Sequence, residues 1–117
     1  MAPGREVQEL MDLAKRVYNE YNEELRKAWE KFKKIAERDY GAANGELWLD
    51  FVNEAQDKIY KKYKDIYVDI FHEDYVLITV GKEDWLVSYS DGEWEVWNLR
   101  TGEVEFIEDK ERDGCEC

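Results

Sequence analysis

The sequence predicts an α+β fold in which an N-terminal antiparallel helix hairpin precedes a five-stranded antiparallel β-meander. Two observations predict this fold. Apolar residues recur every three or four positions in the first half of the chain, as on amphipathic helices, and at every second position in the second half, as in strands. Turn sequences containing glycine separate the second half into short segments. A length of 117 residues fits one domain, which we expect to span residues 1–108.

The first helix is expected at about residues 6–39, a stretch that contains neither proline nor glycine. Its apolar positions follow alternating steps of four and three residues, which is typical of a heptad seam. Such a helix is about 50 Å long, whereas a compact domain of this size is about 30–35 Å across. We therefore expect the helix to kink, to extend beyond the core or to pair with another chain. The seam consists of Val7, Met11, Ala14, Tyr18, Tyr21, Leu25, Ala28, Phe32 and Ile35, and it is widened by Leu10, Val17, Trp29 and Ala36.

The second helix is expected at about residues 46–64, after a short link that suits an antiparallel hairpin. Gly41 is expected to end the first helix in a left-handed conformation, and Asn44 is expected to cap the start of the second. The hairpin is expected to cover one face of the sheet, because an amphipathic helix must bury its apolar stripe.

Five strands are expected between about residues 66 and 107, at 66–71, 75–80, 85–90, 93–99 and 103–107. Asp91-Gly92 predicts a type I′ hairpin turn, because both residues tolerate positive φ angles. Arg100-Thr101-Gly102 predicts a three-residue hairpin loop with Gly102 in the left-handed region. His72 falls in a turn between the first two strands, where we expect it to be exposed.

The predicted loop places Leu99 opposite Glu103 in the last hairpin, and this register assigns each side chain to a face of the sheet. One face would be a core face carrying Trp94, Val96, Val104 and Phe106. The other face would combine four glutamates with three large apolar side chains: Glu93, Glu95, Glu103, Glu105, Trp97, Leu99 and Ile107.

The net charge of −12 is confined to the second half of the chain. Residues 1–64 contain 13 Lys and Arg and 13 Asp and Glu, which gives 13 − 13 = 0. Residues 65–117 contain 4 and 16, which gives 4 − 16 = −12. Such asymmetry has two interpretations. In the first, the acids keep a solvated face soluble; in the second, they form a docking surface for a basic partner.

Large apolar side chains among the acids favour a docking surface, because aromatic anchors are common at interfaces. We therefore predict a non-enzymatic acidic interaction protein that binds a basic surface of a nucleic-acid-handling protein. By analogy of size and charge alone, it would act as an inhibitor or DNA mimic, like the anti-restriction and anti-CRISPR proteins of phages and other mobile elements. The predicted binding residues are Glu93, Glu95, Trp97, Glu103, Glu105, Asp91 and Asp84.

The alternative is a self-associating structural or scaffold protein, either virion-derived or designed. The long heptad seam motivates it, since such a seam can form a homodimer through the first helix. The predicted contact residues are Val7, Met11, Ala14, Tyr18 and Tyr21.

Other function classes have little support in the sequence. No nucleophile motif or glycine-rich phosphate loop occurs, so no enzyme activity and no cofactor are predicted. Direct nucleic-acid binding is disfavoured by the charge, although lysines interleave with tyrosines at 58–67. With no membrane span or signal segment in the sequence, a cytoplasmic protein is expected, in the host cell if phage-encoded. Residues 109–117 are expected to form an acidic mobile tail, and Cys115 and Cys117 within it are not expected to bind metal.

Overall fold

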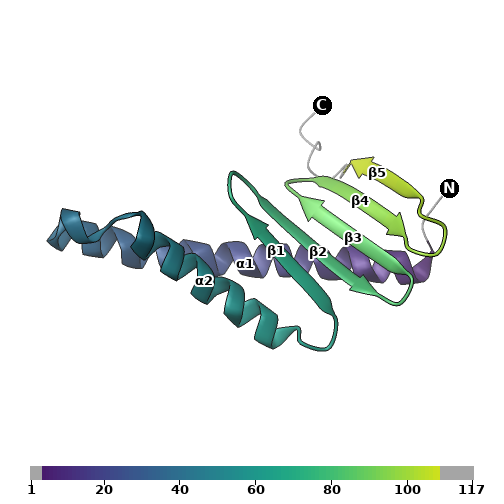
Figure 1. Cartoon of the computed structure of the whole chain (residues 1–117), viewed down its shortest axis with the longest axis horizontal. Coiled ribbons are helices and arrows are strands. Elements are labelled where there is room, and N and C mark those ends of the chain that lie inside the picture. Colours follow the sequence, from purple (N-terminus) through teal and green to yellow (C-terminus); the bar gives the residue numbers. More distant parts are fainter. Residues whose placement is uncertain (1–3, 109–117) are drawn as a thin grey trace, which may run out of the picture. The chain divides into compact units, whose positions relative to one another are not determined.

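The computed structural model describes residues 4–108 and shows two long helices followed by a five-stranded sheet (Figure 1). The strands lie in the order β1-β2-β3-β4-β5, and each neighbouring pair is antiparallel. The predicted α+β fold with a β-meander is therefore confirmed. The elements are α1 (Arg5–Arg38), the 3-10 turn η1 (Tyr40–Ala42), α2 (Gly45–Lys62), β1 (Tyr67–His72), β2 (Val76–Lys82), β3 (Trp85–Ser90), β4 (Glu93–Asn98) and β5 (Val104–Glu108).

The chain forms two compact units. Unit 1 comprises residues 1–18 and 63–117, and so contains the first half of α1 and the whole sheet. Unit 2 comprises residues 19–62 and contains the second half of α1 together with α2. α1 is one continuous helix that begins in unit 1 and ends in unit 2.

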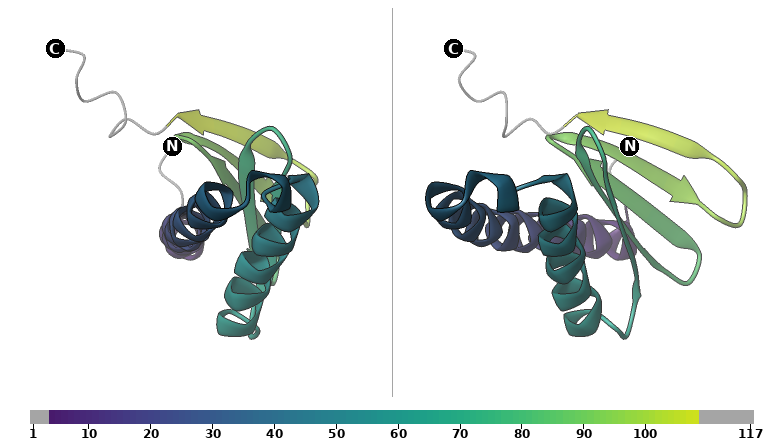
Figure 2. Two further views of the ribbon diagram at one scale, coloured as in Figure 1. Left: turned by 90° about the vertical axis from the view of Figure 1, so that its left-hand side faces the viewer. Right: turned by 60° about the vertical axis from the view of Figure 1, so that its left-hand side comes forward.

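The core of unit 1 lies between one face of the sheet, here called the inner face, and the first half of α1 (Figure 2). The ring of Tyr18 on α1 meets the ring of Tyr89 on β3 edge-on, with centroids 4.8 Å apart. Strand alternation places every second side chain on this face. Its buried members are Ile70, Ile78, Val80, Val87, Tyr89, Trp94 and Val96.

The buried stripe of α1 in unit 1 differs from the predicted seam. Leu10 and Val17, which were expected only to widen the seam, are buried, whereas Met11 and Tyr18 are half-buried. Ala14 lies between them and is fully buried. A helix packed on a sheet buries a broad stripe, whereas the seam of a coiled coil is narrower, and this explains the difference.

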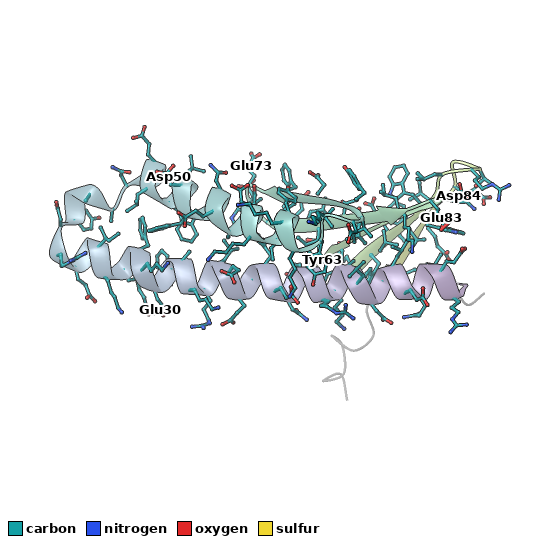
Figure 3. The ribbon with its side chains drawn as sticks, turned by 90° about the horizontal axis from the view of Figure 1, so that it is seen from below. Glu30, Asp50, Tyr63, Glu73, Glu83 and Asp84 are labelled. Atoms are coloured by element: carbon teal, nitrogen blue, oxygen red, sulfur yellow. The ribbon has the colours of Figure 1, made fainter. Side chains whose placement is uncertain are left out.

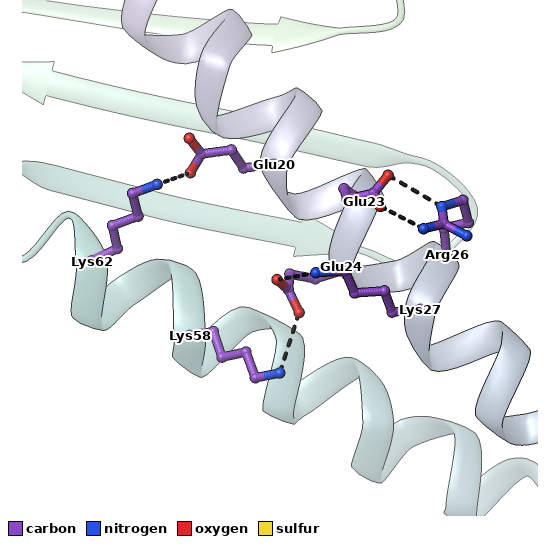
Figure 4. A network of polar contacts seen from close by, with 7 residues as sticks. All are labelled: Glu20, Glu23, Glu24, Arg26, Lys27, Lys58 and Lys62. Carbon is purple, nitrogen blue, oxygen red and sulfur yellow. Dashed lines mark hydrogen bonds and ion pairs between the residues drawn. The ribbon is translucent and has the colours of Figure 1, made fainter.

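Unit 2 is an antiparallel helix hairpin, as predicted. Glu20 pairs with Lys62 at 3.0 Å, and Glu24 pairs with Lys58 at 3.3 Å (Figure 4). Moving along α1 from Glu20 to Glu24 therefore moves backwards along α2 from Lys62 to Lys58, as in an antiparallel pair of helices. Farther along, the two helices share an aromatic cluster of Trp29, Phe32, Trp48 and Phe51.

The link between the helices confirms one predicted cap and corrects the other. The side-chain oxygen of Asn44 accepts a hydrogen bond of 3.0 Å from the amide of Leu47, as expected for an N-cap. Gly41 is not among the residues with positive φ, so the predicted left-handed conformation is wrong. Instead, the Asp39 carboxylate accepts a 3.2 Å hydrogen bond from the Gly41 amide and holds this segment in the turn η1.

The φ angles in the two predicted hairpin turns are positive at the expected residues. Asp91 and Gly92 both have positive φ, 46° and 88°, as a type I′ turn requires. Gly102 has φ 82° in the last loop. That loop, however, begins earlier than predicted.

The register of β4 and β5 is shifted by one residue from the prediction. Trp97 lies opposite Val104, and Glu95 lies opposite Phe106. The cause is Asn98, whose side-chain oxygen accepts hydrogen bonds from the amides of Arg100 and Thr101 at 3.0 and 3.3 Å. This cap starts the turn at Asn98, so Leu99 belongs to the loop rather than to β4. Because side chains alternate, the shift exchanges the two faces of β5.

His72 is the last residue of β1 rather than part of an exposed turn, and its side chain is half-buried. Burial lowers the pKa of its imidazole below 6.5. The strand extends this far because His72 still pairs with Val76 across the β1–β2 hairpin.

Candidate functional site

The candidate functional site is the other side of the sheet, here called the outer face, which no described element of unit 1 covers. Large apolar side chains are exposed on it: Phe106 is 74% exposed and Tyr67 is 56% exposed. Exposed aromatic residues gathered on one surface are typical of interaction sites. The outer-face strand positions are Tyr67, Asp69, Phe71, Leu77, Thr79, Gly81, Leu86, Ser88, Ser90, Glu93, Glu95, Trp97, Val104, Phe106 and Glu108.

The charged side chains at the outer-face positions of the described strands are all acidic. They are Asp69 on β1, Glu93 and Glu95 on β4, and Glu108 on β5. No lysine or arginine occupies an outer-face position in these strands. The face therefore combines exposed rings with negative charge, a composition that suits a partner carrying both apolar and basic groups.

Hydrogen bonds between side chains order the middle of the outer face. The Trp97 indole Nε1 donates to the Glu95 carboxylate at 3.0 Å. The hydroxyl groups of Thr79 and Ser88, which are opposite each other in β2 and β3, lie 2.9 Å apart. Ser88 is buried although it lies on this face.

A hollow of about 740 Å³ opens on the outer face near the β3–β4 turn. Aromatic residues, carboxylates and two serines, Ser88 and Ser90, line it together. Its lining includes Tyr75, Phe106, Asp91, Glu93, Glu95 and Glu108.

Four of the seven predicted binding residues lie together. Glu93, Glu95 and Trp97 share the outer face of β4, and Asp91 lies in the adjoining β3–β4 turn and lines the hollow. Leu99, predicted on the same face, lies in the β4–β5 loop and is 52% exposed.

The remaining three predicted residues lie elsewhere. Glu105 points to the opposite side of the sheet, because it lies opposite the inner-face residue Val96. Together with Glu103 it lines a separate hollow of about 400 Å³. Asp84 lies beside Glu83 in the β2–β3 turn, at the far end of the sheet from Glu73 (Figure 3). Its carboxylate is 3.9 Å from the Arg100 guanidinium, which offsets its charge in part.

The residues predicted for self-association are mostly used inside the chain. Val7, Ala14 and Tyr21 are 3%, 0% and 0% exposed, and Tyr18 packs against Tyr89. Burial raises the pKa of Tyr21 to about 12, against a smaller lowering effect of its hydrogen bond with Gln56.

The sequence prediction missed most of the outer-face rings. In β1, Tyr67 and Phe71 lie on the outer face on either side of Asp69, and Val68 and the buried Ile70 lie on the inner face, so the strand has apolar side chains on both faces. A strand apolar on both sides normally indicates a sheet covered on both sides. Here that pattern was the available signal of a second apolar surface. Phe106 was missed because the incorrect register placed it in the core.

Among residues 4–108, no group of three or more His, Cys, Asp or Glu side chains could hold a metal ion. In the same part of the chain, no helix is long and apolar enough to cross a membrane. The predicted mobile tail, with Cys115 and Cys117, lies outside the described residues.

Comparison with protein-family models, with curated proteins and with solved structures gives no match to this chain. The chain is an α+β protein, and no described element of unit 1 covers the acidic and aromatic outer face of its sheet.

Proposed function

We propose that this chain is a non-enzymatic interaction protein whose outer face binds a protein surface that is both basic and apolar. The observation that carries the proposal is the exposure of aromatic rings on a face whose strand charges are all acidic. Trp97, Phe106 and Tyr67 would supply apolar contact area, and Glu93 and Glu95 would pair with lysine or arginine.

A protein partner is favoured over a nucleic acid by the sign of the charge. The phosphate backbone requires basic side chains, whereas this face repels it. An apolar surface alone would not explain Glu95, whose carboxylate is held beside Trp97 by a hydrogen bond of 3.0 Å. Such a pair offers a ring and a fixed negative charge to one basic, apolar partner group.

We further propose that the partner is a nucleic-acid-handling protein whose basic surface this chain occupies as an inhibitor. The net charge of −12, all of it in the second half of the chain, supports this. Basic surfaces that bind phosphates attract an acidic protein by the same long-range electrostatics. The separation of Glu103 and Glu105 from Glu93 and Glu95 makes the acidic array smaller than predicted, so the rings would contribute more of the affinity.

The test is capture from a cell lysate by three forms of the immobilised protein, with identification by mass spectrometry. The first form is the wild type, and the second carries Glu93→Gln and Glu95→Gln. The third carries Glu54→Gln and Asp57→Asn, two exposed acids on α2 in unit 2. The second and third forms lose the same charge, so they differ only in where it is lost.

We expect basic proteins to be held by the wild type and the α2 variant, released by salt and lost from the outer-face variant. Duplex DNA should displace them if the partner handles nucleic acid. Equal capture by all three forms would contradict the outer face as the binding surface. Partners that DNA does not displace would contradict the inhibitor assignment alone.

A further inference from the structure

The open edge of β5 adds a second feature to this surface. β5 is an outermost strand of the sheet, and no strand among the described residues pairs with its free side. A free strand edge presents unpaired backbone groups, and proteins commonly protect such edges with proline, bulges or a covering element. β5 contains no proline, and Phe106 at its middle is 74% exposed.

The hydrogen-bonding pattern identifies which backbone groups face the free edge. The Asn98 amide donates to the Glu103 carbonyl at 2.9 Å, so these residues form a hydrogen-bonded pair between the strands. Such pairs alternate with non-bonded pairs along an antiparallel ladder. Residues 105 and 107 therefore also bond to β4. The amide and carbonyl groups of Val104, Phe106 and Glu108 point to the free edge.

The two sides of the chain have different chemistry over residues 103–106. Val104 and Phe106 lie on the outer face, whereas Glu103 and Glu105 project to the opposite side and are exposed. The order reverses at the end of β5, where Ile107 lies on the opposite side and Glu108 on the outer face. A strand added beside β5 would place alternate side chains next to apolar residues and next to glutamates. The best complement is an extended segment in which basic residues alternate with apolar ones.

We infer that β5 binds its partner by strand addition and selects an extended segment with alternating basic and apolar residues. This inference rests on the proposed function and names its mode of recognition. A second copy of the chain is a poorer occupant, because it would bring another acidic strand beside Glu103 and Glu105. The acids thus discourage self-pairing and favour a basic strand.

The test uses two labelled synthetic peptides whose binding is followed by fluorescence anisotropy. In one peptide lysine alternates with valine, and in the other the same residues are arranged with the lysines clustered at one end. We expect the alternating peptide to bind at least about fivefold more tightly, since only it places all its lysines on one side of the added strand, where they can face Glu103 and Glu105. Equal affinity for the two peptides would overturn the inference.

Two variants at one position separate the backbone from the side chain. Phe106→Ala removes the ring, and Phe106→Pro also removes the amide that faces the free edge, without breaking a bond to β4. We expect the alternating peptide to bind the proline variant at least about fivefold more weakly than the alanine variant. Equal binding by the two variants would contradict strand addition.

Amide hydrogen exchange in the wild-type protein provides a test that needs no variant to fold. The amides of Val104, Phe106 and Glu108 should exchange more slowly when the alternating peptide is bound. Unchanged exchange in the presence of the peptide would contradict strand addition. The proposed function would still stand if the Glu93→Gln, Glu95→Gln variant lost the proteins that the wild type captures. Normal capture by that variant would contradict the proposed function.

Discussion

The indole Nε1 of Trp97 donates a hydrogen bond of 3.0 Å to the carboxylate of Glu95, two positions earlier on the same face of β4. The bond links an exposed ring to a charge and restricts the rotamers of both. Because these side chains are ordered before binding, less conformational entropy is lost when a partner docks. The pair is therefore suited to act as an anchor on the outer face.

Replacing Trp97 with alanine should weaken binding of a captured partner by about tenfold or more, as for an aromatic anchor residue. Trp97→Phe keeps most of the ring but loses the donor to Glu95, so its effect should be smaller. Isothermal titration with the captured protein would measure both. Trp29→Ala is the matched control, because Trp29 is 47% exposed but lies in unit 2. An equal loss for Trp29→Ala would argue against the outer face.

The turn between β4 and β5 should depend on the Asn98 side chain. Asn98→Ala removes the acceptor of the hydrogen bonds from Arg100 and Thr101, and we expect it to cost about 1 kcal/mol of unfolding free energy. Asn98→Asp keeps an acceptor oxygen and should cost less. Urea denaturation of the two variants would measure this. Equal destabilisation would show that the side-chain oxygen does not fix the turn.

The same residue explains where the sequence prediction failed. Period-two alternation predicted the strands, and Asp91-Gly92 predicted the β3–β4 turn, because both depend on local chemistry. The β4–β5 register depended on whether the loop begins at Asn98 or after Leu99. Both loops place Gly102 in the left-handed region, so the glycine alone did not distinguish them. The position of the loop is decided by the hydrogen bonds that the Asn98 side-chain oxygen accepts from the amides of Arg100 and Thr101.

The candidate site was predictable in part. Glu93, Glu95 and Trp97 occupy one strand, and their shared face follows from alternation whatever the register of β5. The contribution of β5 required the register, and the error exchanged Phe106 for Glu105. The exposure of Tyr67 could not be predicted from the sequence of β1, since a strand with apolar side chains on both faces does not indicate which face remains uncovered.

The two faces of the sheet should respond differently to truncation. Val87 is fully buried on the inner face, between Val80 and Val96, and Val87→Ala should cost about 2–3 kcal/mol of unfolding free energy. Phe106→Thr should change it by no more than about 0.5 kcal/mol, since that ring is already in water. Thermal unfolding would compare them. A large loss for Phe106→Thr would indicate a structural role and weaken the proposal that this ring serves binding.

Tyr21 should make the fold sensitive to alkaline pH. Burial raises its pKa from 10.0 to about 12, so the folded state holds the phenolic proton more strongly than the unfolded state does. The resulting stabilisation is complete below pH 10 and is lost as the pH rises from 10 towards 12. Urea unfolding of the wild type should therefore show a lower free energy within this interval than below it.

Tyr21→Phe isolates this effect, because it removes the titrating group and keeps the buried ring. The variant also loses the hydrogen bond with Gln56, which lowers its stability below pH 10 without creating a pH dependence. The measured quantity is therefore the change in unfolding free energy between the two pH values, which should be smaller in Tyr21→Phe than in the wild type. Tyr40→Phe is the control, since Tyr40 is 86% exposed and its replacement should leave the pH dependence as in the wild type. If Tyr21→Phe lost as much stability as the wild type on raising the pH, other groups would have to account for the alkaline unfolding.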